Sequence, residues 1–199
     1  MTNLVRSFRV PDGPELRVSV GDLTRWSAAT VPGLAPDANC AIVNAANETL
    51  LGGGGVDGAI HRAAGPGLLA ETRILPEHSR GVRCRVGEAV LTAGHRMAVP
   101  FIIHTVGPRF FQNPDPAEAL RRAYRSCLAV AAGAGIEAVA FPALSCGVFR
   151  YPPEEAAEIS ISVCSRAPPS IRWIEFVLFS PKFGKIWSDQ VERRCRDLA

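Results

Sequence analysis

A run of four glycines, Gly52 to Gly55, joins a predicted strand to a predicted helix. The strand is the apolar run "CAIVNA" at residues 40–45, and the helix follows as "VDGAIHRAAG" and stops before Pro66. Consecutive glycines lose much backbone entropy on folding and bury no side chain, so they are typical of a place where backbone must approach a ligand closely. The junction therefore indicates an α/β chain with a ligand-binding loop.

The rest of the chain alternates between strand and helix patterns. Strands that alternate with helices predict an α/β sandwich with a largely parallel sheet. The predicted strands cover residues 16–20, 40–45, 87–94, 101–106, 136–142 and 171–180. The predicted helices cover residues 56–65, 117–135, 152–167 and 184–198.

The length of 199 residues predicts one domain, 1–199, whose first 15 residues are either an extension or an edge strand. The net charge of +3 is small, and the basic residues are scattered without interleaved aromatic residues. Nucleic acid is therefore a disfavoured partner. We expect a monomer.

The six cysteines lie far apart and form no CxxC pair or zinc-finger spacing with histidines. We therefore expect free thiols, no metal and no cofactor. The N-terminus lacks an apolar run of signal-peptide length, and no stretch reaches the length of a membrane span. These features predict a cytoplasmic protein without a membrane partner.

Polar or glycine-rich groups follow four of the predicted strands. Because ligands of parallel α/β sheets bind beyond the carboxyl ends of the strands, these four groups are expected to converge on one cleft. They are Asp22, Asn44 and Asn47 with the glycines, Ser145-Cys146-Gly147, and Ser180.

The glycine run suits an anion. Backbone N–H groups at a strand-to-helix junction point toward an anion, and the helix N-terminus adds partial positive charge. The run has no GK[ST] ending, so it is not a Walker A loop. Amides without a lysine favour a diphosphate held between this loop and a second one, "PALSCGVFRYPP" at residues 142–153. The alternative for the glycine run is a flexible turn, and the alternative for the second loop is an ordinary strand-to-helix connection.

Asp57 follows the glycines at the predicted first turn of the helix. The helix N-terminus is expected to keep its carboxylate ionised, so that it can orient or deprotonate a water. His61 lies four residues later on the same helix face and can assist Asp57. A plain helix-start acid and a structural histidine are the alternatives.

Three further residues are candidates. Asn47 carries a donor and an acceptor and can hold a vicinal diol. Asn44 is interpreted as shaping the loop. Asp22 can accept from an exocyclic amine such as that of adenine, or can cap a helix that begins at Leu23.

These motifs resemble the macrodomain family, specifically its MacroD-type ADP-ribosyl hydrolase branch. The resemblance runs from residue 16 to 197 through "GDLT", "IVNAAN", "GGGGVDGAIHRAAGP", "GEAVLTAG", "IIHTVGP" and "AFPALSCGVFRYP". It implies a three-layer α/β/α sandwich with a central mixed sheet and a cleft for ADP-ribose.

The resemblance also implies residue roles. Asp57, Asn47 and His61 would be catalytic, and Asn47 would hold the distal ribose against Phe149. Asp22, Leu23 and Phe179 would contact the adenine. The remaining implied ligand contacts are Asn44, Ala46, Gly54, Gly55, Val56, Ser145, Cys146, Gly147 and Val148.

The implied reaction removes mono-ADP-ribose from Glu or Asp side chains of proteins, and deacetylates O-acetyl-ADP-ribose. The reaction would need no metal: a water positioned by Asp57 and the bound diphosphate would attack while the carboxylate leaves. A non-catalytic ADP-ribose reader and an ADP-ribose 1″-phosphate phosphatase are the alternatives. A hydrolase with Cys146 as nucleophile is disfavoured, because no histidine stands at motif spacing from it.

The second loop departs from the family pattern. The family sequence Ser-Thr-Gly-Ile-Tyr-Gly is replaced by Ser-Cys-Gly-Val-Phe-Arg at residues 145–150. Backbone amides make the contacts, so Cys146 should be tolerated, and Phe149 keeps the aromatic ring. Arg150 is the largest change, because it is expected to strain a position with positive φ or to add a cation at the cleft rim.

Overall fold

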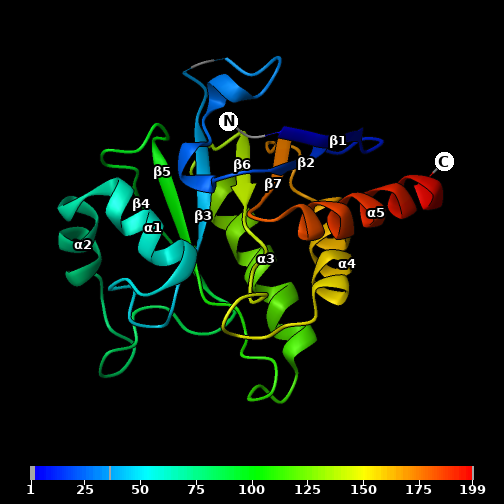
Figure 1. Cartoon of the computed structure of the whole chain (residues 1–199). Coiled ribbons are helices and arrows are strands. Elements are labelled where there is room, and N and C mark those ends of the chain that lie inside the picture. Colours follow the sequence, from blue (N-terminus) through cyan, green and yellow to red (C-terminus); the bar gives the residue numbers. More distant parts are fainter. Residues whose placement is uncertain (1–2, 36, 199) are drawn as a thin grey trace.

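The fold is described from a computed structural model, which covers residues 3–35 and 37–198 (Figure 1). Seven strands form one sheet in the order β1-β2-β7-β6-β3-β5-β4. Strands β2, β7, β6, β3 and β5 are parallel, whereas β1 and β4 are antiparallel to their neighbours. The strands are β1 Asn3–Arg9, β2 Glu15–Val20, β3 Cys40–Ala45, β4 Ala89–Ala93, β5 Phe101–Thr105, β6 Ala138–Phe141 and β7 Trp173–Leu178.

Five α-helices cover the two faces of the sheet (Figure 1). Successive residues of β3 point to opposite layers: Val43 packs in the cluster that contains residues of α3, α4 and α5, and Ile42 in the one that contains residues of α1 and α2. The predicted three-layer sandwich with a mixed, largely parallel sheet is confirmed. The helices are α1 Gly55–Ala64, α2 Pro66–Arg73, α3 Pro116–Gly133, α4 Pro153–Cys164 and α5 Pro181–Leu198.

The sequence interpretation missed helix α2. Gly65-Pro66 was interpreted as a stop, and Gly65 does end α1 with a φ of 77°. Pro66 then occupies the first turn of α2, where proline lacks only an N–H that would have no helical partner. The same residues therefore end one helix and begin the next.

The N-terminal residues extend the sheet. Strand β1 pairs with β2 along the edge, with Phe8 opposite Leu16. Its antiparallel direction requires only the short turn between Arg9 and Glu15, whereas a parallel partner would need a crossover.

A buried ion pair lies between β2 and β7. Arg17 Nε is 3.4 Å from Glu175 Oε2, and both side chains are buried. Ser19 Oγ donates to Glu175 Oε1 at 2.6 Å, and Trp26 Nε1 donates to Oε2 at 3.1 Å. The carboxylate is therefore surrounded by donors, as a buried charge requires.

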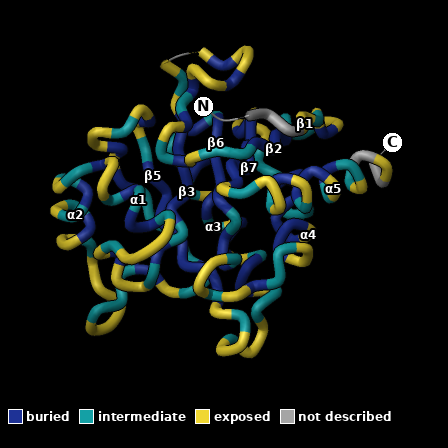
Figure 2. Tube along the Cα trace, in the orientation of Figure 1, coloured by how far each residue is buried: buried dark blue, intermediate teal, exposed yellow. Residues whose placement is uncertain are grey.

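The carboxyl ends of the five parallel strands lie together at one end of the sheet. The loops there are exposed, whereas the strands remain buried (Figure 2). The segments at this end of the sheet begin with Asp22, Asn47, Gly107, Ser145 and Phe179. The expected loops therefore lie at the same end of the sheet. In the described part of the chain, no helix has the length and apolarity needed to cross a membrane.

Candidate functional site

Asp57 lies in the first turn of α1 and is buried, with 3% of its surface exposed. Its Oδ1 accepts a hydrogen bond from Asn44 Nδ2 at 2.7 Å and lies 3.5 Å from His61 Nε2. Its Oδ2 is buried and has no hydrogen-bond partner among the described residues. One carboxylate oxygen is therefore held in place and the other remains available.

Burial raises the pKa of Asp57, and the hydrogen bond from Asn44 and the proximity of His61 only partly oppose this effect. We expected the helix N-terminus to keep this carboxylate ionised. The direction of the pKa shift is the opposite, because desolvation disfavours the charged form more than these contacts favour it. A carboxylate with a raised pKa is a better proton acceptor.

Asn44 does not shape the loop, which corrects the sequence interpretation. It lies in β3, is fully buried, and places Nδ2 2.7 Å from Asp57 Oδ1 and 3.0 Å from His104 Nδ1. An ionised carboxylate only accepts hydrogen bonds, so the Asn44 amide must donate to Asp57. Asn44 therefore positions the catalytic candidate from the sheet.

The same geometry assigns the tautomer of His104. With Asn44 donating to Nδ1, the ring proton is on Nε2 and is donated to Thr92 Oγ1 at 2.9 Å. Burial lowers the pKa of His104 to about 3, so the ring is neutral. Sequence reasoning missed His104 and Thr92, although a histidine inside the apolar run "FIIHTV" was the available signal.

Asn47 is held by its own loop. Its Nδ2 donates to the Gly52 carbonyl at 2.9 Å, and its Oδ1 accepts from Thr49 N at 3.0 Å and Thr49 Oγ1 at 2.6 Å. A Cβ added at Gly53 would lie 2.9 Å from Asp57 Oδ2 and 3.2 Å from Asn47 Nδ2. The absence of a side chain at Gly53, which was not among the predicted ligand contacts, therefore leaves the space next to both polar groups open.

The first loop leaves backbone donors accessible. Gly54 is the N-cap of α1 and provides no side-chain hydrogen bond to it, and Gly54 and Gly55 are exposed. Val56 is half-buried, and the N–H of the buried Ala46 donates to Thr105 O, which extends the pairing of β3 with β5. The first turn of α1 thus has the geometry of an anion-binding helix terminus.

The second loop is a strained turn. Ser145 has a φ of 63° and a buried Oγ without a partner among the described residues, and Arg150 has a φ of 55°. The expected positive φ at Arg150 is therefore observed. Gly147 and Val148 are exposed. Unusual backbone conformations of this kind cluster at binding sites.

Cys146 is a poor nucleophile in this environment. Burial raises the pKa of its thiol to about 12, and the nearby Glu154 carboxylate acts in the same direction. Its Sγ donates to Leu144 O at 3.4 Å, and among the described residues no histidine forms a hydrogen bond with it. A neutral thiol disfavours the cysteine-hydrolase alternative.

The residues expected at the adenine follow strands β2 and β7. Asp22 accepts from Thr24 N at 2.9 Å and Thr24 Oγ1 at 2.8 Å, so it caps the 3₁₀ turn Leu23–Arg25. The capping alternative is thus realised. Leu23 is buried, whereas Phe179 is 90% exposed. Asp22 and Phe179 follow the paired ends of β2 and β7, and an exposed aromatic ring with a carboxylate on the adjacent segment suits a heteroaromatic ligand.

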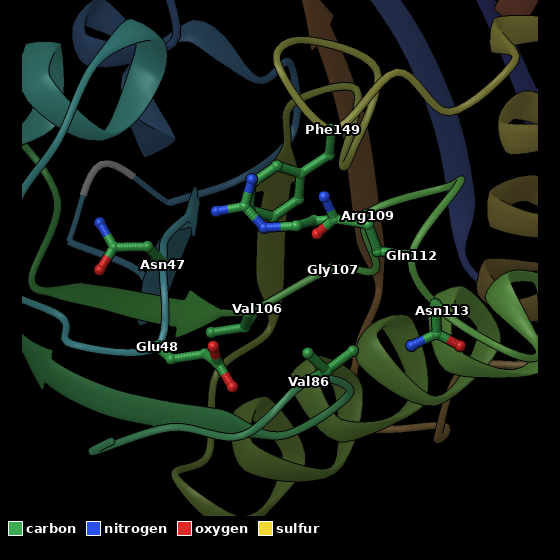
Figure 3. A pocket seen from close by; sticks show the side chains of 9 residues that line it. All are labelled: Asn47, Glu48, Val86, Val106, Gly107, Arg109, Gln112, Asn113 and Phe149. Atoms are coloured by element: carbon green, nitrogen blue, oxygen red, sulfur yellow. The ribbon is translucent and has the colours of Figure 1, made fainter. Parts of the chain in front are cut away.

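Two hollows lie near the residues of the candidate site. A cavity of about 240 Å³ includes Asn47 in its lining, with Phe149 and Arg109 opposite (Figure 3). A second hollow of about 410 Å³ is lined by Gly52, Gly53 and His61, among others. The first hollow therefore gives access to Asn47, and the second to Gly52 and Gly53 of the glycine loop.

Comparison with known proteins agrees with this geometry. The Macro domain family model matches residues 43–160. O-acetyl-ADP-ribose deacetylase 1 of Pantoea vagans is 42% identical over 164 residues, which are 82% of this chain and 88% of that protein. O-acetyl-ADP-ribose deacetylase of Salmonella typhimurium is 42% identical over 151 residues, 75% of this chain and 77% of that one.

Solved structures give the same result. The Oceanobacillus iheyensis macrodomain with ADP superposes with a TM-score of 0.86 at 34% identity and covers 99% of both chains. The Trypanosoma brucei macrodomain in complex with ADP-ribose has a TM-score of 0.73 at 32% identity, over 88% of this chain and 68% of that one. With its glycine loop, its strained second loop and its mixed sheet, the chain belongs to the macro domain family.

Proposed function

We propose that this chain binds ADP-ribose and hydrolyses the bond between the distal ribose and a carboxylate. The substrates are O-acetyl-ADP-ribose and proteins mono-ADP-ribosylated on Glu or Asp. The observation that carries the proposal is the buried, unpartnered Oδ2 of Asp57, next to the Asn47 amide across Gly53. The names of the relatives and the ligands of the structural neighbours support it.

The two loops divide the ligand between them. The open amides at the start of α1 and those of the second loop, residues 145–150, accommodate the diphosphate, since neutral N–H donors suit an anion at a helix N-terminus. Asp22 and Phe179 accommodate the adenine, and Asn47 the distal ribose. The binding energy of the remote adenine and diphosphate then orients the reacting bond.

Asp57 activates a water. Its raised pKa makes the carboxylate a competent acceptor for one proton of the water, and Asn44 fixes its orientation. The water oxygen bonds to the ribose carbon that carries the carboxylate, while the bond from that carbon to the carboxylate oxygen breaks. One proton of the water passes to Asp57, and the products are ADP-ribose and the free carboxylate. No step requires a metal or a cofactor.

The test is release of acetate from O-acetyl-ADP-ribose, and of ADP-ribose from a protein modified on Glu or Asp. Wild type is compared with Asp57→Ala, Asn47→Ala and the exposed control Asp189→Ala. We expect Asp57→Ala to lower turnover at least 100-fold with ADP-ribose affinity retained. Asn47→Ala should lower both turnover and affinity, and Asp189→Ala neither.

Two results would change the conclusion. Binding of ADP-ribose by wild type without turnover of either substrate would leave a reader. Release of phosphate from ADP-ribose 1″-phosphate, with no release of acetate or ADP-ribose, would favour the phosphatase.

A further inference from the structure

The cavity beside Asn47 is lined by a positively charged side chain, Arg109, that has no role in the proposed reaction. Arg109 lies just beyond β5, and its Cζ is 4.5 Å from the centroid of the Phe149 ring (Figure 3). Both residues line the cavity of about 240 Å³ together with Asn47. The guanidinium therefore stands at the wall of a space that is continuous with the candidate distal-ribose contact.

The backbone beside Arg109 is anchored. The N–H of Phe110 donates to Phe149 O at 2.9 Å, which joins the segment after β5 to the second loop. The Phe110 ring packs edge-on against Tyr151 with 5.0 Å between centroids, and Tyr151 is buried. The position of Arg109 above Phe149 is therefore supported by three aromatic residues from two segments.

The charge of Arg109 is available. Within the described residues, no carboxylate lies close enough to Arg109 to form an ion pair with it. Glu48 lines the same cavity without forming one, and Figure 3 shows its carboxylate well apart from the guanidinium. A stacked guanidinium keeps its edge N–H donors free for a planar or tetrahedral oxyanion.

We propose that Arg109 is an anion subsite for the group carried on the distal ribose. This inference rests on the proposed function, which puts the reacting bond beside Asp57 and Asn47. The ligand chemistry is an oxyanion at that end, either the carboxylate that leaves during hydrolysis or a phosphate on the 1″ oxygen. As the bond breaks, its electron pair stays on the carboxylate oxygen, and Arg109 stabilises that charge.

Calorimetry of two ligands provides the first test. The affinity of ADP-ribose 1″-phosphate relative to ADP-ribose is measured for wild type, Arg109→Gln and Arg62→Gln. Arg62 is the matched control, because it lines the second hollow, with Gly52 and Gly53, and not the cavity that contains Arg109. We expect Arg109→Gln to lower the ratio about tenfold with ADP-ribose affinity unchanged within about twofold, and Arg62→Gln to leave the ratio unchanged.

Kinetics distinguish the two sources of the anion. If the leaving carboxylate uses the subsite, Arg109→Gln lowers kcat for O-acetyl-ADP-ribose about tenfold with little change in KM, and Arg109→Lys restores part of it. If only a 1″-phosphate uses it, kcat stays at the wild-type value and the affinity ratio alone falls.

The proposal is overturned if the affinity ratio is the same in Arg109→Gln and wild type, or if Arg62→Gln lowers it equally. Either result, with ADP-ribose still bound by wild type, leaves the proposed function intact. Absence of ADP-ribose binding by wild type would overturn the proposed function and the subsite with it. Circular dichroism of each variant checks that the fold is retained.

Discussion

The Asn44 amide nitrogen lies 2.7 Å from Asp57 Oδ1 and 3.0 Å from His104 Nδ1. One NH₂ group therefore connects the catalytic candidate on α1 with a neutral histidine inside the sheet. Because His104 in turn contacts Thr92 at 2.9 Å, the chain of contacts behind Asp57 extends through β5 to β4. This chain of contacts can be tested.

Thr92→Val removes the acceptor of the His104 Nε2 proton with almost no change in volume. The other tautomer then becomes accessible, and it places a second donor against the Asn44 amide. We expect kcat/KM for O-acetyl-ADP-ribose to fall about threefold to tenfold while ADP-ribose affinity is retained, and Thr92→Ser to restore activity. Equal activity of Thr92→Val and wild type would contradict this chain of contacts.

His104 should make stability depend on pH. Its pKa is about 3 in the folded protein against 6.5 in the unfolded chain. Between these values the unfolded state binds a proton that the folded state does not. The stabilisation is therefore complete above pH 6.5 and is lost as the pH falls toward 3, with a slope of up to about 1.4 kcal/mol per unit.

The measurement is urea unfolding of wild type and His104→Asn between pH 7 and pH 4. Asparagine can keep an acceptor near the position of Nδ1 but does not titrate. We expect the variant to be less stable at pH 7 and the difference to narrow at lower pH. Parallel pH dependences of the two proteins would show that His104 is not the titrating group.

Asp57→Asn should stabilise the protein and abolish turnover. The raised pKa of Asp57 means that its contribution to stability is present below the pKa of the unfolded chain and is lost as the pH rises through the folded pKa. At pH 7.5 the neutral amide avoids this cost and still accepts from Asn44. We expect a gain on the order of 1 kcal/mol, seen as a rise of about 2–4 °C in Tm. A fall in Tm would contradict the unfavourable burial of the charge.

Gly53→Ala should disable the site without disrupting the fold. The new Cβ would lie 2.9 Å from Asp57 Oδ2 and 3.2 Å from Asn47 Nδ2, so it occupies the space between the two polar groups. We expect turnover to fall at least tenfold. Gly133→Ala is the control, because a Cβ there has nothing within 4 Å. Full activity of Gly53→Ala would show that this space is not used.

Glu175→Gln should strongly destabilise the protein. It removes the buried charge partner of Arg17 and leaves the guanidinium only the carboxylate of Glu15, whose Oε1 lies 3.5 Å from Nη1, so the loss is at most about 3–5 kcal/mol. The control is Glu137→Gln, which removes the exposed pair with Arg172 at 3.4 Å and costs less than about 1 kcal/mol. Denaturant unfolding of both variants provides the comparison, and equal losses would contradict the effect of burial.

The order of strands and helices and the place of the glycine loop were predictable from the sequence. Apolar periodicity and glycine or proline breaks are local signals, and each main element lies within a few residues of its predicted range. Helix α2 was missed, because Gly65-Pro66 both ends and begins a helix, and β1 lies in the first 15 residues, for which an extension and an edge strand both remained open.

The candidate site was predictable only in part. Asp57, Asn47 and the glycines stand together in one segment, so their proximity followed from local spacing. The tertiary structure alone decided that Asn44 holds Asp57, because the parallel register places Asn44 beside His104 in the neighbouring strand. It also decided the direction of the Asp57 pKa shift and the stacking of Arg109 on Phe149. Desolvation and contacts between distant segments arise from packing, which no short stretch of sequence encodes by itself.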